Sequence, residues 1–166
     1  MYQLFLEAIE RNAEKITNTL MEEIHVRPEV WHYLAASDEV ISDRISKVIK
    51  SVYVWLGNWL KKNEPKNILF AYYSNLGAER CHEGIPLEEV TMVLLLIKRE
   101  IWNMISTQKV FDNGFTLNQL VEINYNVNLL FVRIIQSTIA GYQSELAITA
   151  LKSGREKQLP GKTFRI

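Results

Sequence analysis

Cysteine is almost absent from this chain, which has Cys81 as its one thiol among 166 residues. A lone cysteine cannot form an internal disulfide, and secreted domains usually carry cysteines in pairs, so we expect a reducing, cytoplasmic compartment. The first 24 residues also lack the basic, apolar and small-residue segments of a signal peptide. A chain of this length buries about 70% of its unfolded surface, so it can form a core without disulfides or metals.

The chain also lacks a net charge of either sign, and it lacks a long hydrophobic run. Nineteen Lys and Arg residues balance nineteen Asp and Glu residues. Nucleic-acid-binding domains usually carry a basic face, so we expect no nucleic-acid partner. The apolar run Val93–Ile97 is far shorter than the ~20 residues that a membrane-spanning helix needs. We therefore expect no membrane partner, and the composition is that of one globular domain.

Apolar residues recur every three or four positions through most of the chain, a spacing that predicts amphipathic helices. The helices are expected from about Tyr2 to Glu23, from Ser37 or Asp38 to about Lys61, from Pro65 to near Gly84, from Pro86 to at least Ile105, and from Thr116 to about Leu151. A short helical turn is expected around Glu29–Leu34. No segment shows the two-residue alternation of a half-buried strand. The predicted fold is an all-α antiparallel bundle of four to five helices with a long C-terminal helix.

Proline, glycine and capping residues separate these helices. Pro28 ends the first helix, because proline in a helix interior loses a hydrogen bond and clashes with the preceding turn. Turn sequences follow at Asn63-Glu64-Pro65 and Asp112-Asn113-Gly114. Thr116 and Gln119 have the spacing of a capping box, in which each side chain binds a backbone N–H of the other residue.

We expect the helices over residues 1–151 to form one domain, and the resemblance described below implies a sensory or regulatory domain. Residues 152–166 contain five basic residues, one acidic residue, two glycines and a proline. This composition predicts an exposed basic tail or a linker.

No spacing of histidines indicates a metal site. His25, His32 and His82 form no pair at the helical separations that bring two ligands to one face. Glu22 and His25 make one Glu-x-x-His motif, whereas a diiron bundle needs two. We expect no metal and no cofactor, although a single axial haem ligand would leave no spacing signature, so haem stays open.

Catalytic motifs are also missing. The chain has no Gly-rich phosphate loop, G-x-S-x-G elbow or H-E-x-x-H run. Cys81 and His82 are adjacent, and adjacent helical side chains point about 100° apart rather than toward each other. We therefore predict an inert, partly buried cysteine and no enzymatic activity.

Aromatic residues are concentrated in the middle of the chain. Trp55, Trp59, Tyr72 and Tyr73 could line a pocket for an apolar ligand. The same residues at helical spacing could instead fill the bundle core, which is the commoner role of aromatic side chains.

One stretch is more specific. Leu76–Val90 combines an arginine-bearing helix end with a Gly-Ile-Pro-Leu-Glu-Glu turn, and Leu94–Trp102 is a strongly apolar helix that ends in Lys-Arg-Glu-Ile-Trp. This stretch resembles the N-terminal domain family of the RsbT co-antagonist proteins, of the RsbRD type. The detailed match covers about a fifth of the chain, and the helix count agrees from Tyr2 to about Ala150. By this resemblance, the chain looks like a small helical sensory module of the kind that precedes a STAS domain, a histidine kinase or another bacterial signalling output domain, including output domains of the stress response. The resemblance implies signal input without catalysis.

The motif residues have structural explanations as well. They are Arg80, Gly84, Pro86, Glu88, Glu89 and Trp102. Gly84 is expected to take the left-handed conformation that ends a helix, and Pro86 to occupy the first turn of the next one. Glu88 and Glu89 suit the positive end of that helix dipole.

Arg80 lies about one turn before the loop. It is within reach of Glu83, Glu88 and Glu89, and we predict a charge-assisted contact with Glu88 or Glu89.

The last helix carries a heptad spacing. Leu120, Val127 and Ile134 are seven apart, as are Ile123 and Leu130, and this spacing suits packing along another helix. We call Leu120, Val127, Leu130 and Ile134 the predicted seam. Small or polar residues follow it and would permit close approach of a second helix: Gln136, Ser137, Thr138, Gly141 and Ser144. We predict a homodimer through the fourth and fifth helices, with an ordinary bundle helix as the alternative.

These observations favour a bacterial signal-transduction input domain that acts through protein–protein contacts, with or without a small ligand. The expected partner is a STAS or histidine kinase output domain. The alternative is a haem- or lipid-binding helical carrier that has no signalling output.

Overall fold

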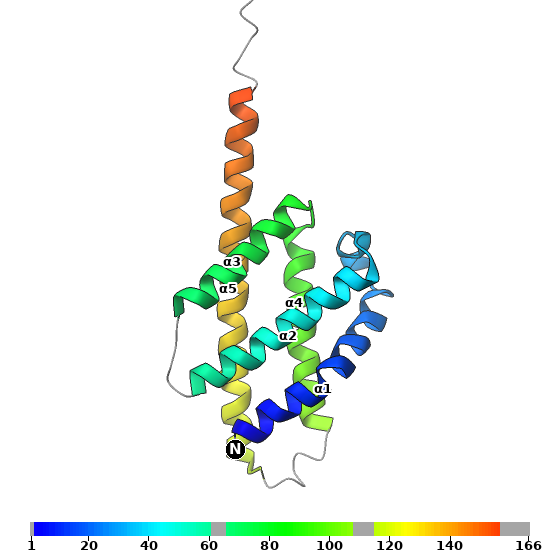
Figure 1. The fold of residues 1–166 in the computed structure, drawn as a ribbon, viewed down its shortest axis with the longest axis vertical. Coiled ribbons are helices and arrows are strands. Elements are labelled where there is room, and N and C mark those ends of the chain that lie inside the picture. Colours follow the sequence, from blue (N-terminus) through cyan, green and yellow to red (C-terminus); the bar gives the residue numbers. More distant parts are fainter. Residues whose placement is uncertain (1, 61–65, 108–114, 157–166) are drawn as a thin grey trace, which may run out of the picture.

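A computed structural model describes residues 2–60, 66–107 and 115–156 of the chain (Figure 1). Five α-helices and two short 3₁₀ turns make up this part: α1 Tyr2–Ile24, η1 Pro28–Val30, η2 Tyr33–Ala35, α2 Asp38–Leu60, α3 Lys66–His82, α4 Leu87–Thr107 and α5 Leu117–Glu156. The described residues contain no strand. The predicted all-α bundle with a long C-terminal helix is confirmed. The predicted breaks at 63–65 and 112–114 lie outside the described residues.

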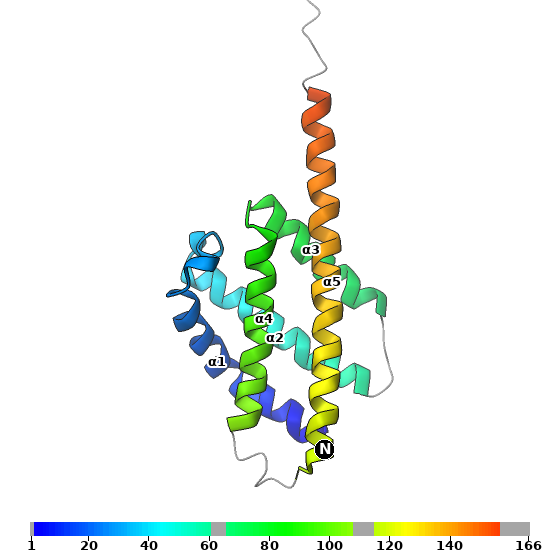
Figure 2. The ribbon, with the colours of Figure 1, turned by 180° about the vertical axis from the view of Figure 1, so that it is seen from behind.

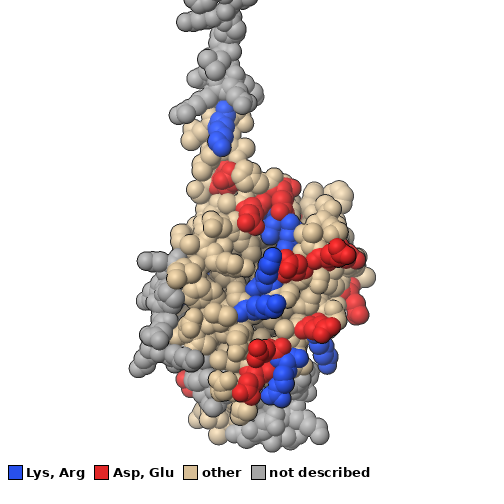
Figure 3. Space-filling model, viewed as in Figure 1, with Lys and Arg blue, Asp and Glu red and all other residues tan. Residues whose placement is uncertain are grey.

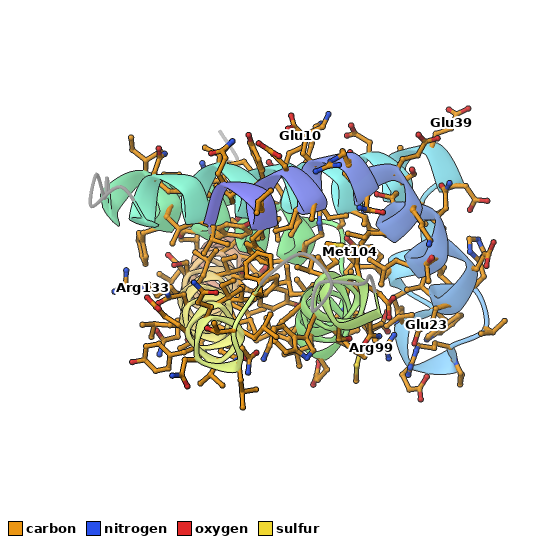
Figure 4. All side chains as sticks on the ribbon, turned by 90° about the horizontal axis from the view of Figure 1, so that it is seen from below. Glu10, Glu23, Glu39, Arg99, Met104 and Arg133 are labelled. Atoms are coloured by element: carbon orange, nitrogen blue, oxygen red, sulfur yellow. The ribbon has the colours of Figure 1, made fainter. Side chains whose placement is uncertain are left out.

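The helices form two layers. α1 and α2 run antiparallel in one layer, and α4 and α5 run antiparallel in the other, while α3 crosses α5 (Figures 1 and 2). Viewed from below, Met104 lies between the layers (Figure 4). The fully buried core includes Tyr73, Phe131, Ile9, Leu20, Ile24, Ile41, Ile45, Ile49, Leu56, Ile97, Ile101 and Ile123. Within the described ranges, no helix is both long and apolar enough to span a membrane.

Local signals set the helix ends as predicted. The Val40 N–H reaches the Ser37 hydroxyl oxygen at 3.4 Å, so Ser37 rather than Asp38 caps α2. Thr116 and Gln119 form the capping box of α5, with N–H contacts of 3.3 Å to the Thr116 hydroxyl and 2.9 Å to the Gln119 amide oxygen. The expected turn at 29–34 is present as the two 3₁₀ turns.

The connection between α3 and α4 is a Schellman motif. Gly84 has a φ of 72°, the Ile85 N–H binds the Arg80 carbonyl at 3.1 Å, and the Gly84 N–H binds the Cys81 carbonyl at 3.0 Å. The predicted role of Gly84 is confirmed. Pro86 lies one residue before α4 rather than in its first turn, and its carbonyl accepts the Val90 N–H at 3.2 Å.

α3 and α5 cross with their backbones in close contact. A Cβ atom on Gly77 would lie 2.0 Å from the Thr138 carbonyl oxygen, and one on Gly141 would lie 1.9 Å from the Ser74 carbonyl oxygen. Each position therefore needs glycine. The small residues late in the chain do permit close approach of a second helix, and that helix is α3 of the same chain.

The predicted seam is buried inside the chain. Its four residues have exposed fractions of 9% or less: Leu120, Val127, Leu130 and Ile134. They pack into the chain's own core, so their prediction as residues of a dimer interface is wrong. A heptad spacing serves any helix neighbour, and here the chain itself supplies the neighbours.

α5 extends well beyond the bundle. Its 40 residues correspond to about 60 Å at 1.5 Å per residue, and its C-terminal end projects as a separate rod (Figure 1). Residues 146–154 are all exposed. The helix continues past the predicted end at Leu151 to Glu156, so the first residues of the predicted tail are helical, and 157–166 lie outside the described residues.

Candidate functional site

A cleft of about 640 Å³ opens between α2, α3 and α4. Its floor is apolar and belongs to the buried core: Val48, Val90, Val93, Leu94 and Ile97. Charged residues of both signs surround it on the face that α2 and α3 share (Figure 3). A volume of this size with an apolar floor and a few polar groups is typical of small-molecule sites.

Two arginines lie deep in the cleft. The Arg80 side chain is 7% exposed and the Arg44 side chain 15% exposed. Both donate to the same oxygen of Glu83, Arg44 Nη2 at 2.7 Å and Arg80 Nη1 at 2.7 Å. The predicted carboxylate contact of Arg80 is therefore made with Glu83, and the expectation of Glu88 or Glu89 is wrong.

Each guanidinium also has a nitrogen without a partner. Arg44 Nη1 and Arg80 Nε are buried and make no hydrogen bond, and among the described side chains no other buried nitrogen or oxygen is in this condition. A buried donor that loses its water without gaining an acceptor costs about 1–3 kcal/mol, more when it is charged. The two arginines share the Glu83 carboxylate, and two of their buried donors are left without an acceptor in the deep part of the cleft.

Tyr33 closes the deep end of the cleft. It belongs to η2, is 6% exposed, and its ring lies 6.0 Å from the Arg44 guanidinium carbon, in a cation–π arrangement. Burial raises the pKa of Tyr33, while the charges of Arg80 and Arg44 and a hydrogen bond from Arg80 to the phenol act in the opposite direction. The phenol therefore stays protonated near neutral pH.

Glu89 holds η2 in place against α4. Its carboxylate is buried, accepts the Tyr33 N–H at 2.9 Å and contacts His32 Nδ1 at 2.5 Å. Glu88 is exposed in the first turn of α4, where it suits the helix dipole as predicted. Trp102 is half-buried against the core. Glu89 thus positions Tyr33 rather than pairing with Arg80.

The rim of the cleft is exposed and carries most of its acids. Asp43 pairs with Lys47 at 2.6 Å, and Glu79 lies 3.7 Å from Arg80 Nη2 with its side chain 66% exposed. Glu39 also lies at the rim. Water and salt screen exposed charges much more than buried ones. The deep part of the cleft is therefore positive, and the outer part is weakly acidic.

The aromatic residues predicted as an apolar pocket do not converge, as far as their side chains are described. Tyr72 lines the cleft and is 40% exposed. Tyr73 packs edge-on against Tyr72 but points into the core, where its hydroxyl contacts Ser51 and burial raises the pKa of the phenol. Trp55 is half-buried against the core, and the Trp59 side chain lies outside the described residues. The pocket prediction is wrong for Trp55 and Tyr73, which fill the core as the alternative had it, and it stays a prediction for Trp59.

The histidines occupy three separate places, each beside one carboxylate. His25 lies 2.9 Å from Asp38 and His82 lies 2.9 Å from Glu145, while His32 contacts the carboxylate of α4 described above. In the described part of the chain, no group of three or more His, Cys, Asp or Glu side chains could hold a metal ion.

Cys81 is partly buried, as predicted. Burial raises the pKa of the thiol, and the nearby charge of Glu145 raises it further. This is the opposite of the shift that activates a nucleophilic cysteine.

Arg44 was not singled out by the sequence interpretation, although a signal for it exists. It lies three residues after Ile41 and four before Val48, on the apolar stripe of α2. A charged residue on a buried stripe needs a buried partner. Arg80 has the same character on α3, where it follows Tyr73 and Gly77 at helical spacing.

The resemblance of residues 76–102 to the N-terminal domains of RsbT co-antagonist proteins stays a prediction, because no family model, no curated protein and no solved structure matches the chain.

Proposed function

We propose that this protein is a non-catalytic input domain of bacterial signal transduction that passes its output to a protein partner through α5. The projecting end of α5 is the observation that carries this proposal. It exposes Leu146 at 55% and Leu151 at 66%, with no helix of the described chain beside it. A short isolated helix is marginally stable in water, and helices in proteins gain most of their stability from packing. A partner helix would supply that packing.

The α3 helix supports a relay between the cleft and α5. Leu76 and Arg80 line the cleft, while Ser74 and Gly77 on the same helix touch the backbone of α5. A shift of α3 caused by an event in the cleft would therefore act directly on α5, a few turns before it leaves the bundle. A packed crossing of this kind tends to move between discrete arrangements rather than to deform smoothly.

A second heptad spacing on α5 supports a helical partner. Tyr125, Val132, Ile139 and Leu146 are seven apart, and we call them the outer stripe. Tyr125 is 64% exposed, Val132 49% and Leu146 55%, and Ile139 is half-buried. Leu95 on α4 is also exposed. We still propose homodimerisation through α4 and α5. The contact residues on α5 are now those of the outer stripe, and no longer the buried residues of the predicted seam.

The experiment introduces charge on the outer stripe and measures association. Val132→Glu should weaken self-association, or association with a STAS or histidine kinase output domain, in analytical ultracentrifugation. Val54→Glu on α2 is the matched control, because Val54 has the same side chain and the same 49% exposure. Equal behaviour of the two variants, or a wild-type chain that is monomeric and binds neither class of output domain, would contradict the proposal.

The cleft favours one alternative, a lipid-binding carrier without signalling output. Its apolar floor could hold an acyl chain, and mass spectrometry of the purified protein would detect such a lipid. Haem fits less well, because none of the three histidines lines the cleft. A Soret absorption band in the purified protein would nevertheless favour the haem carrier.

A further inference from the structure

We propose that the cleft between α2, α3 and α4 binds a small organic monocarboxylate with an apolar body, whose carboxylate pairs with Arg44 and Arg80 beside Glu83. The contacts of the two guanidinium groups favour a ligand that carries a negatively charged group. Both guanidinium groups donate to Glu83, Glu79 beside Arg80 is exposed and 3.7 Å away, and each arginine keeps one buried N–H nitrogen without an acceptor. A ligand carboxylate would supply the acceptors that these two nitrogens lack.

A second arginine cluster in the chain shows what a complete arrangement looks like. Arg27 and Arg99 both donate to Glu23, and Arg99 also binds Glu100 at 2.9 Å, so two cations face two anions. Figure 4 shows Glu23 and Arg99 side by side. Burial by itself would raise the pKa of Glu23, but hydrogen bonds from Arg99 and Arg27 lower it. This balanced cluster has no unpartnered buried nitrogen, and its arginine side chains are 30% and 41% exposed, so water also reaches them.

The depth of each charge selects a monoanion. Arg80 and Arg44 lie deep, whereas Glu39, Asp43 and Glu79 lie exposed at the rim. A nucleotide or another polyanion would bring several negative charges past these acids, which repel each of them. A single carboxylate can reach the arginines and leave no second charge at the rim.

The floor selects an apolar body. Val48, Val93 and Ile97 are buried at 4%, 2% and 1% exposure and line the same 640 Å³ cleft. These side chains expose almost no surface of their own, so the gain comes from the apolar body of the ligand, whose surface leaves water on contact with them and contributes about 25 cal/mol per Å². Because the two unpartnered nitrogens are enclosed, the guanidinium groups must turn toward the ligand, and Arg80 would carry that change into α3.

The test uses octanoate as probe, measured by isothermal titration calorimetry and by NMR of the arginine Nε–H groups. Octanoate should bind saturably and shift the Arg80 Nε–H signal. Octanol has the same tail without the charge, and acetate has the charge without the tail, so both should bind at least tenfold more weakly. Octanol or acetate binding as tightly as octanoate would overturn the proposal, as would an octanoate titration without saturation.

Three variants assign the binding to the arginines. Arg44→Gln should weaken octanoate binding at least tenfold, and Arg99→Gln in the balanced cluster is the matched control that should leave it unchanged. Glu83→Gln should strengthen binding, because it removes the carboxylate that competes for both guanidinium groups. Glu83→Gln is expected to raise the affinity, whereas a variant that folds poorly can only lower it. The test therefore stays valid even if an arginine variant folds poorly. Equal affinities in all three variants would refute the site. Binding is measured on this chain alone, so the outcome is separate from that of the α5 proposal.

Discussion

Replacing Gly77 or Gly141 with alanine should destabilise the fold, although alanine is the better helix former. The added Cβ would lie 2.0 Å from the Thr138 carbonyl oxygen in the first case and 1.9 Å from the Ser74 carbonyl oxygen in the second. Both obstructions are backbone atoms of a helix, so no side-chain rotation can relieve them. α3 and α5 would have to move apart, and they have the most extensive contact of any two helices in the described part of the chain.

The magnitude follows from two opposing effects. Glycine to alanine in a helix contributes up to about 1 kcal/mol in favour of the variant. Overpacking a tight contact costs typically about 1–3 kcal/mol, occasionally more, and these overlaps lie at the severe end. We therefore expect each variant to lose about 2 kcal/mol of unfolding free energy, which for a domain of this size lowers the melting temperature by roughly 4–8 °C.

The assay is thermal and urea unfolding followed by circular dichroism. Gly154→Ala is the control, because no atom lies within 4 Å of its added Cβ, and its melting temperature should be unchanged or slightly higher. The double variant of Gly77 and Gly141 should lose less than the sum of the two single losses, because one separation of the helices relieves both overlaps. Alanine variants as stable as the wild type would refute the close crossing.

Three further outcomes are expected. Gly84→Val should cost about 1 kcal/mol or more in unfolding experiments, and Gly84→Asn less, because the positive φ rather than space is the constraint. Glu89→Ala should lower the melting temperature while Glu88→Ala, at an exposed position, should not, since Glu89 accepts the hydrogen bonds that hold η2. The Met21 carbonyl and Asp38 raise the pKa of His25 above 6.5, so NMR titration should show a raised value that Asp38→Asn lowers in part. The stabilisation from protonated His25 is complete below pH 6.5 and is lost as the pH rises through the folded-state pKa.

Local features of the fold could be predicted from the sequence because their causes are local. The capping box of Thr116 and Gln119 needs two side chains three residues apart, and Gly84 with Pro86 marks a helix connection on its own. The predicted start of α1 coincides with the observed one, and its predicted end is one residue short. Amphipathic spacing and helix punctuation require no knowledge of what lies across the core.

The partners of individual residues could not be predicted in the same way. A heptad spacing indicates that Val127 and Ile134 pack against a helix, but not whether that helix belongs to the same chain. Glu83 and Glu89 are both near Arg80 in sequence. Glu89 is turned away because η2, more than fifty residues earlier in the chain, offers it hydrogen-bond donors. Arg44 reaches the same cleft from α2, a juxtaposition that only the tertiary packing produces.

α3 lines the cleft and α5 carries the outer stripe, and the two helices cross in close contact, so the free energies of ligand binding and of dimerisation should be linked. If saturating octanoate changes the dimer dissociation constant by some factor, dimerisation must change the octanoate affinity of each of the two sites by the square root of that factor. Couplings of this kind are typically about 1–3 kcal/mol, which is roughly 5–150-fold. Comparing octanoate affinity between the wild-type dimer and the Val132→Glu variant measures one side of the cycle, and sedimentation with and without octanoate measures the other. Gly141→Ala, which separates α3 from α5, should reduce both factors together. Octanoate binding that leaves self-association unchanged would mean that the crossing at Gly141 holds the fold together without transmitting a signal.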